Sequence, residues 1–164
     1  MAVLSDSDIL NMLKDGSLGI DGFVEDNLTP NGYDVTIEEV QILPRGKKVK
    51  SGTAVIPART WFVIGTKESI RLPDNLVGEI WIRTSWARKG VLSSFGRIDA
   101  GFHGNLTFSA FNASRNRVEL EVGDRFAQVV FEELRSAPTK NYSVRSGNYQ
   151  GQKGITLRPK RDKS

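Results

Sequence analysis

The pattern of apolar and polar positions between residues 33 and 134 is that of a β protein. Residues 33–37, Tyr-Asp-Val-Thr-Ile, alternate apolar with polar side chains as a half-buried strand does. Turn sequences rich in Gly, Pro, Asn and Asp separate further short runs of this kind. These runs are 53–56, 60–64, 77–82, 91–94, 105–111, 118–122 and 126–131. Many short strands with regular turns predict a sandwich, a jelly roll or a barrel.

The two ends of the chain follow other patterns. Ser5-Asp6-Ser7-Asp8 resembles a capping box, and the apolar residues that follow it at helical spacing predict one short helix that stops near Gly16. After Leu134 the strand pattern ends, and residues 136–154 are punctuated by Gly, Pro and Asn. This segment is typical either of an arm that closes over a site or of a disordered terminus.

Composition excludes several kinds of chemistry. The 164 residues suffice for one domain with a real core, and the chain contains no cysteine and a single histidine, His103. A disulfide framework, a thiol nucleophile and a multi-histidine metal site are therefore excluded. Deamination of the zinc-dependent type is excluded as well, because it needs a His/Cys ligand set.

The charge pattern restricts the classes of molecule that the protein is expected to bind. The formal net charge of +4 suits an anionic ligand, although part of the excess lies in residues 158–163, where a solvated tail is the simpler interpretation. We find no basic stripe interleaved with aromatic residues, no apolar run of membrane-spanning length and no signal peptide. We expect a cytoplasmic protein that binds neither nucleic acid nor membrane.

Two short runs hold the candidate chemistry. Residues 83–90, Arg-Thr-Ser-Trp-Ala-Arg-Lys-Gly, gather three cations and two hydroxyls in one turn, which suits a polyphosphate; the alternative is a basic surface turn in which Ser85 caps a helix. Residues 96–104 place the carboxylate of Asp99 among glycines, with Phe102 three residues later. A ligand can approach such backbone closely, although an aspartate beside Ala-Gly is also common in ordinary turns.

Five runs in order carry a family resemblance: NGYDV (31–35), RTSWARKG (83–90), GRIDAGFHGNLTF (96–108), GDRFAQVVFEEL (123–134) and NYQGQKG (148–154). Together they resemble the motifs of the dUTPase and dCTP deaminase superfamily, and the match spans nearly the whole chain. The resemblance implies a mainly β fold, a distorted jelly roll of the dUTPase-like β-clip type with a short N-terminal helix. It also implies one domain over residues 1–135, and an arm over residues 136–164 (hereafter the C-terminal arm) that closes over the active site.

The same resemblance implies a homotrimer with three active sites at its subunit interfaces. Asp99 matches the catalytic aspartate, Phe102 the ring that packs on the deoxyribose, and Asp34 the acidic residue of the first motif. The remaining residues implied to bind the substrate are Arg83, Thr84, Ser85, Trp86, Ala87, Arg88, Thr107, Phe108, Ser109, Gln128, Tyr142 and Gln152.

One position decides which activity this reasoning predicts. Deaminases of the superfamily carry a proton-shuttling glutamate five residues after the glycine of the Asp99 motif, and here that position is Ser109, which cannot shuttle protons. The later carboxylates Glu119 and Glu121 alternate like ordinary solvent-facing charges.

We therefore predict a dUTP diphosphatase, in which Asp99 activates water for attack at the α-phosphorus. The protein would bind Mg²⁺ through the triphosphate of dUTP, with no direct metal ligand. The alternatives are a dCTP deaminase, a bifunctional enzyme with both activities, or a nucleotide-binding or capsid-like jelly roll without activity.

Overall fold

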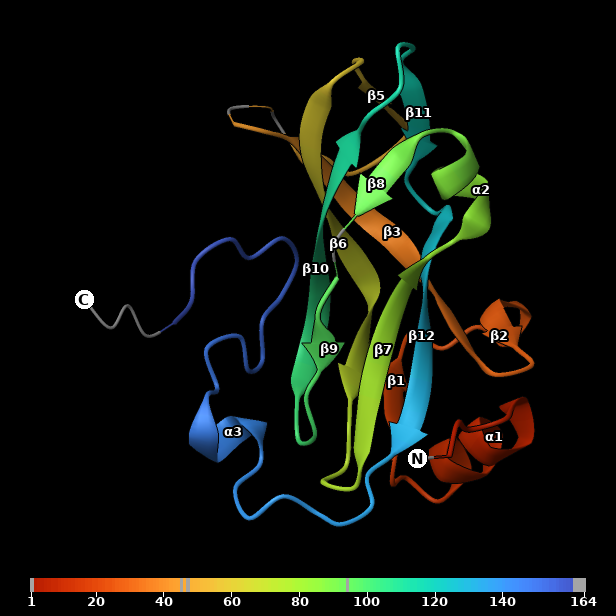
Figure 1. Ribbon diagram of the computed structural model, residues 1–164, viewed down its shortest axis with the longest axis vertical. Coiled ribbons are helices and arrows are strands. Elements are labelled where there is room, and N and C mark those ends of the chain that lie inside the picture. Colours follow the sequence, from red (N-terminus) through yellow and green to blue (C-terminus); the bar gives the residue numbers. More distant parts are fainter. Residues whose placement is uncertain (1, 45, 47, 94, 161–164) are drawn as a thin grey trace.

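The structure is a computed structural model that describes residues 2–44, 46, 48–93 and 95–160 (Figure 1). The helices are α1 (Asp6–Lys14), η1 (Glu25–Asn27), α2 (Thr84–Arg88) and α3 (Tyr142–Arg145). The strands are β1 (Gly19–Asp21), β2 (Leu28–Thr29), β3 (Gly32–Ile42), β4 (Lys48–Val49), β5 (Thr53–Ile56), β6 (Thr60–Arg71), β7 (Leu76–Ile82), β8 (Val91–Ser93), β9 (Arg97–Ile98), β10 (His103–Asn112), β11 (Val118–Glu121) and β12 (Arg125–Glu133). The prediction of a mainly β fold with a short N-terminal helix is confirmed.

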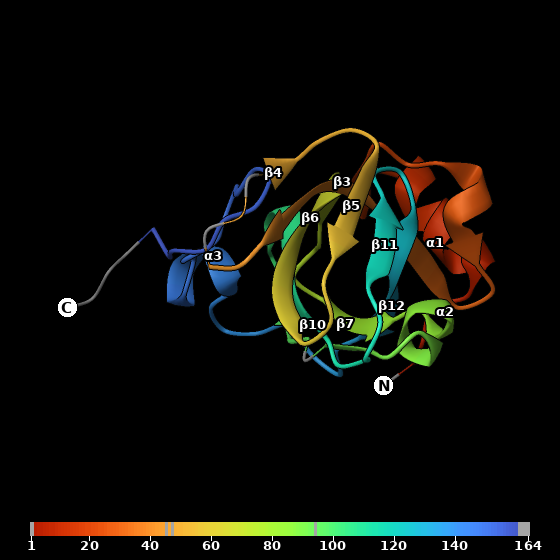
Figure 2. The same cartoon turned by 90° about the horizontal axis from the view of Figure 1, so that it is seen from above.

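Most of the strands belong to one antiparallel sheet with the order β8-β10-β6-β3-β12-β7-β9. β1 adds to β6, β2 and β4 add to β3, and β5 pairs with β11 in a separate small sheet. Seen from above, the large sheet curls around the core (Figure 2). Within the described residues, no helix has the length and apolarity that crossing a bilayer requires.

The N-terminal helix begins where its capping sequence predicts. The backbone amide of Asp8 donates to the Ser5 hydroxyl at 3.3 Å, and the Ser5 amide donates back to the Asp8 carboxylate at 2.9 Å. This reciprocal pair satisfies two amides that the first turn leaves without partners. Ile9 points into the core and is fully buried, so α1 is held against the sheet.

Strands β3 and β6 are longer than the predicted runs 33–37 and 60–64. Their additional length contains polar side chains that are nevertheless buried, among them Glu39, Thr66 and Glu68, so the expected alternation of apolar and polar positions breaks down. A buried polar side chain is tolerated where it is hydrogen-bonded. The Glu68 carboxylate, for example, accepts a 2.8 Å hydrogen bond from the Thr36 amide on β3. Ser94, the end of the predicted strand 91–94, lies outside the described residues.

An aromatic cluster around Phe126 forms the part of the core that lies behind the candidate site. Ring centroids of Phe62, Trp86, Phe95 and Phe108 lie 6.0–6.5 Å from that of Phe126. These rings come from β6, α2, the loop before β9, and β10. The cluster therefore joins the two sequence motifs that were predicted to bind a ligand.

Candidate functional site

The Asp99 motif lines a hollow beside the first half of β10. We call it the β10 hollow. Its lining residues come from β7, the turn around β9, β10 and the C-terminal arm: Ile80, Gly96, Arg97, Ile98, Asp99, Phe102, Leu106, Thr107, Phe108, Tyr142, Tyr149 and Gln152. The structure thus brings together Asp99, Phe102, Thr107, Phe108, Tyr142 and Gln152, all of them residues that the sequence predicted for the site.

Strand β10 shows the predicted alternation. Leu106, Phe108 and Ala110 are buried, whereas Asn105 and Thr107 are half-buried and Ser109 is exposed. This places Leu106 and Phe108 against the apolar wall of the β10 hollow, with Thr107 at its rim. Ser109 lines neither this hollow nor the second one described below.

The C-terminal arm, described through Lys160, packs over the loop that carries Asp99 (Figure 1). The Tyr142 amide donates to the Ala100 carbonyl at 2.9 Å, and the Tyr142 ring meets Phe102 edge-to-face with centroids 5.6 Å apart. Further along, the Tyr149 amide donates to the Tyr142 hydroxyl at 2.9 Å. These contacts bring Tyr142 and Tyr149 to the hollow as two aromatic walls.

Gln152 fixes the arm to β10. The Asn105 amide donates to the Gln152 carbonyl at 3.0 Å, and the Gln152 side-chain amide donates to the Asn105 carbonyl. This approach requires Gly104, because a Cβ atom there would lie 3.0 Å from the Gln152 backbone nitrogen and the φ of +150° disfavours other residues. The glycine of the motif therefore makes room for the arm.

The predicted phosphate cradle lies at the start of α2. Arg83 is the N-cap of this helix, and its carbonyl accepts bonds from the amides of Trp86 and Ala87. A hollow, which we call the α2 hollow, opens beside it and is lined by Thr29, Asp34, Trp81, Ile82, Arg83, Thr84, Ser85 and Gln128. The interpretation of Ser85 as the helix cap is wrong, since Arg83 holds that position.

Asp34 organises the charges of the α2 hollow. Its side chain is only 6% exposed, and Oδ2 lies 2.9 Å from Nε of Arg83 and 3.8 Å from Nη1 of Arg125. Burial raises the pKa of the Asp34 carboxyl above its ordinary value, and the two guanidinium groups oppose that rise. Nε of Arg83 is held by Asp34 and Nη1 donates to the Arg125 carbonyl at 3.4 Å, so Nη2 is the guanidinium nitrogen without a partner among the described residues.

Three predicted cradle residues lie elsewhere on α2. Trp86 is buried, donates from its indole nitrogen to the Arg125 carbonyl at 2.9 Å, and packs on Phe126, so it supports the cradle from behind. Arg88 lines a different hollow together with Lys89 and Arg117, and Ala87 is exposed beside it. Within the described residues of one copy, Arg83 and Arg88 therefore do not converge on one hollow.

The two hollows share no lining residue. Asp34, Gln128 and Trp81 are neighbours in register across β3, β12 and β7, and they form the floor of the α2 hollow. Ile80, the residue before Trp81, lines the β10 hollow. Trp81 and Ile82, the two residues that follow it on β7, line the α2 hollow.

Several residues that line these hollows were not assigned by sequence reasoning, among them Tyr149, Arg97 and Thr29. Tyr149 belongs to the NYQGQKG run, three residues before Gln152, which is a signal that could have identified it. Arg97 pairs with Glu79 on the neighbouring strand at 2.5 Å. The Thr29 hydroxyl accepts from the Gln128 amide at 2.6 Å, and nothing in the sequence pattern around Thr29 indicates this long-range contact.

Comparison with known proteins shows the family of this chain. The model of the dCTP deaminase-like family matches residues 3–134, and the chain belongs to this family. It is 44% identical over 135 residues to a dCTP deaminase of Pyrococcus horikoshii, which covers 80% of this chain and 84% of the relative. It is 42% identical over 140 residues to a dCTP deaminase of Thermococcus kodakarensis, with coverage of 84% and 88%.

Solved structures show the same fold. A 2′-deoxycytidine 5′-triphosphate deaminase from Agrobacterium tumefaciens superposes with a TM-score of 0.69 at 17% identity over 79% of this chain, which spans only 46% of that protein. The EIAV dUTPase superposes with a TM-score of 0.55 at 23% identity, covering 75% of this chain and 93% of that one. The expected dUTPase-like architecture and an enzyme of nucleotide metabolism are thus confirmed in this general form.

The predicted activity, by contrast, is wrong. Ser109 was taken to exclude deamination and to select a dUTP diphosphatase, but the relatives that match over most of the chain are named dCTP deaminases. The residue at position 109 does not determine which carboxylates lie at the β10 hollow, because among the described residues Asp99 lines this hollow and Ser109 does not.

Proposed function

We propose that this protein is a dCTP deaminase. Water adds to C4 of the cytosine ring and the 4-amino group leaves as ammonia, so that dCTP and water give dUTP and ammonia. The names and coverage of the relatives support this substrate. The observation that carries the proposal on the structural side is the β10 hollow, where a carboxylate lies among four aromatic side chains.

Each half of the site has a role that follows from its chemistry. The rings of Phe102, Tyr142 and Tyr149 offer faces and edges to a planar base and an apolar sugar edge. In this proposal Asp99 takes a proton from the attacking water and delivers it to ring N3, and it then moves the hydroxyl proton of the adduct to the 4-amino group, which leaves as ammonia while C4=O forms. The α2 hollow, with Arg83 and the Thr84 and Ser85 hydroxyls, binds the triphosphate.

Magnesium enters the proposal as part of the nucleotide. No group of three or more His, Cys, Asp or Glu side chains suited to a metal ion occurs in the part of the chain that the structure describes. A triphosphate, however, binds Mg²⁺ through its own oxygens and water. We therefore propose that Mg²⁺ reaches the α2 hollow on dCTP, where it reduces the charge that Arg83 must balance.

The proposal predicts the products of a single incubation. Purified protein with dCTP and Mg²⁺ should release ammonia and dUTP in equal amounts, and CTP should react more slowly because a 2′-hydroxyl would crowd Phe102. Ammonia is measured by a coupled assay and the nucleotides by chromatography. Release of pyrophosphate from any of these nucleotides without ammonia would contradict the proposal.

We also propose that the active site is completed between copies in a homotrimer. The two hollows of one chain share no lining residue, so in this proposal the α2 hollow of one copy faces the β10 hollow of another and both bind one nucleotide. Contact between two different surfaces is heterologous, and it generates a ring where the rotation between copies closes. Light scattering should give three times the mass of the chain.

Mixed assemblies test this shared site. An Asp99→Asn chain retains an intact α2 hollow, and an Arg83→Ala chain retains an intact Asp99. Either variant alone should have little activity, but random co-assembly in equal amounts should restore about one quarter of the wild-type rate, since one pairing in four combines both intact halves. Co-expression of both variants with separate tags provides the sample. Failure of the co-assembled trimer to recover activity would show that both halves come from one chain.

A further inference from the structure

A buried carboxylate on β3 lies beneath the C-terminal arm, outside the two hollows. Glu39 is only 3% exposed, and in register it neighbours Gly65 on β6, which in turn neighbours Thr107 on β10. Gly65 is what allows the arm to come so close. A Cβ atom at Gly65 would lie 3.1 Å from both Cγ of Glu39 and the backbone nitrogen of Ile155. The Glu39 carboxylate and the arm backbone therefore approach each other at a position that has no side chain.

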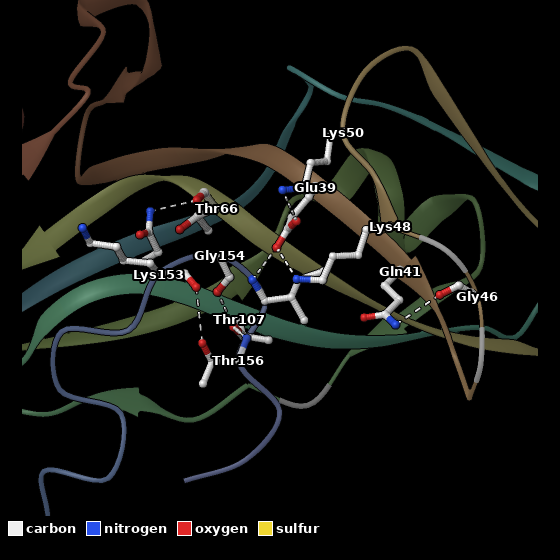
Figure 3. Close-up of polar contacts among 12 residues, drawn as sticks. Glu39, Gln41, Gly46, Lys48, Lys50, Thr66, Thr107, Lys153, Gly154 and Thr156 are labelled. Atoms are coloured by element: carbon white, nitrogen blue, oxygen red, sulfur yellow. Dashed lines mark hydrogen bonds and ion pairs between the residues drawn. The ribbon is translucent and has the colours of Figure 1, made fainter. Parts of the chain in front are cut away.

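Glu39 bonds directly to the arm. Its Oε1 accepts a 2.6 Å hydrogen bond from the Ile155 amide and lies 3.0 Å from Nζ of Lys48. Nζ of Lys50 lies 3.6 Å from Oε2, and Oε2 accepts no hydrogen bond from the described residues (Figure 3). Burial by itself raises the pKa of the Glu39 carboxyl, but the Ile155 amide and the Lys48 ammonium outweigh it, so that pKa lies below its ordinary value.

Thr107, which neighbours Gly65 on the side away from Glu39, connects the arm to the β10 hollow. The Thr156 amide donates to the Thr107 hydroxyl at 3.1 Å, and that hydroxyl donates to the Gly154 carbonyl at 3.3 Å (Figure 3). Thr107 lines the β10 hollow, as does Gln152 two residues before Gly154. The arm is thus attached to two different groups. Gly154 and Thr156 bond to Thr107, which lines the hollow, and Ile155 bonds to Glu39, which lies outside it.

We propose that Glu39 is a positioning residue of the active site: it holds the arm at Ile155 so that Tyr149 and Gln152 stay closed over the β10 hollow. This inference rests on the proposed function, because it assigns the β10 hollow to the base and sugar of the nucleotide. Glu39 itself does not touch the substrate. A hydrogen bond to a charged acceptor is stronger than one to a neutral acceptor, so a carboxylate fixes the arm better than an amide would.

The first test follows the arm without using catalysis. Hydrogen exchange of the amides in residues 149–156 is measured on the full-length protein without nucleotide, for the wild type and for Glu39→Ala and Glu39→Gln. We expect exchange at Ile155 and Thr156 to become about tenfold faster in Glu39→Ala and less so in Glu39→Gln, which keeps an acceptor oxygen. The control is Glu38→Gln, an exposed carboxylate one position earlier on the same strand, which should leave exchange unchanged.

The second test compares KM with kcat for dCTP. Loosening of the arm should raise KM several-fold in Glu39→Ala, with kcat changing less, and Glu39→Gln should recover part of the loss. Unchanged exchange of residues 149–156 in a folded Glu39→Ala protein would overturn the proposal, and so would a uniform fall in kcat without a change in KM. If Glu39→Ala fails to fold, the isosteric Glu39→Gln decides by the same exchange measurement.

The two proposals fail in different ways. Faster exchange of the arm in a protein that releases no ammonia from dCTP would support the role of Glu39 and contradict the function. If the protein releases ammonia from dCTP but hydrogen exchange of the arm is the same in the wild type and the Glu39 variants, the proposed function is supported and the role of Glu39 is contradicted.

Discussion

Replacing Asp99 by Asn is expected to lower kcat for dCTP deamination by about 10²–10⁴-fold, the range that a general acid–base group contributes. Asparagine has the size of aspartate but cannot take a proton from water at neutral pH. Because Asp99 is exposed at the rim of the β10 hollow, the substitution should leave the melting temperature nearly unchanged. Steady-state ammonia release and thermal unfolding measure the two effects.

The matched control for this variant is Glu119→Gln. Glu119 is an exposed carboxylate on β11, it faces Arg117 at 3.1 Å, and it lines a hollow with Arg88 rather than either half of the proposed site. Its loss should leave kcat unchanged. If Asp99→Asn kept its rate within about threefold, the general acid–base role would be ruled out. A parallel loss in Glu119→Gln would indicate that a carboxylate of β11 takes part in the reaction.

Local patterns predicted the parts of the fold that depend on neighbours in sequence. The capping box at Ser5 and the alternation along β10 are both confirmed, because a helix cap involves residues three positions apart and a strand face repeats every second residue. The same alternation buries Leu106 and Phe108, which line the β10 hollow.

Contacts between distant segments were not predictable in this way. Glu39 and Ile155 are 116 positions apart, and their hydrogen bond exists only because β6 brings Gly65 between them. A glutamate inside an apolar run also hides the true length of β3, since a single sequence does not show what satisfies a buried charge. Likewise, strand pairing brings Asp34, Gln128 and Trp81 together at the α2 hollow, although they are far apart in the sequence.

The activity was mispredicted for a related reason. The serine at position 109, where deaminases of the superfamily carry a proton-shuttling glutamate, was treated as sufficient to exclude deamination, although Asp99 had already been assigned to the site. The structure places the Asp99 carboxylate at the β10 hollow and leaves Ser109 outside it. Identity spread over 135 residues carries more information about the reaction than one position does.

Truncation of Phe126 to alanine is expected to have the largest effect on stability, lowering the free energy of unfolding by about 3–5 kcal/mol. Phe126 is only 1% exposed, and four aromatic rings surround it, so the surrounding core cannot easily collapse into the space that its ring would leave. Urea unfolding followed by tryptophan fluorescence measures the loss, since Trp86 lies 6.0 Å away and reports on this cluster. All variants must be compared at one protein concentration if the protein is oligomeric.

Two further variants distinguish the loss of core packing at Phe126 from a general loss of stability of the sheet. Phe126→Leu keeps most of the volume and should cost less than about 1.5 kcal/mol, whereas Val55→Ala on the exposed edge of β5 should change stability by about 0.5 kcal/mol or less. A loss in Phe126→Ala no larger than in Val55→Ala would contradict the structure of the core. Because Phe108 packs on Phe126 with one face and lines the β10 hollow, the alanine variant should also weaken dCTP binding at temperatures where it remains folded. Stability and substrate binding are thus expected to depend on the same ring, which is the physical link between the core of this fold and its proposed chemistry.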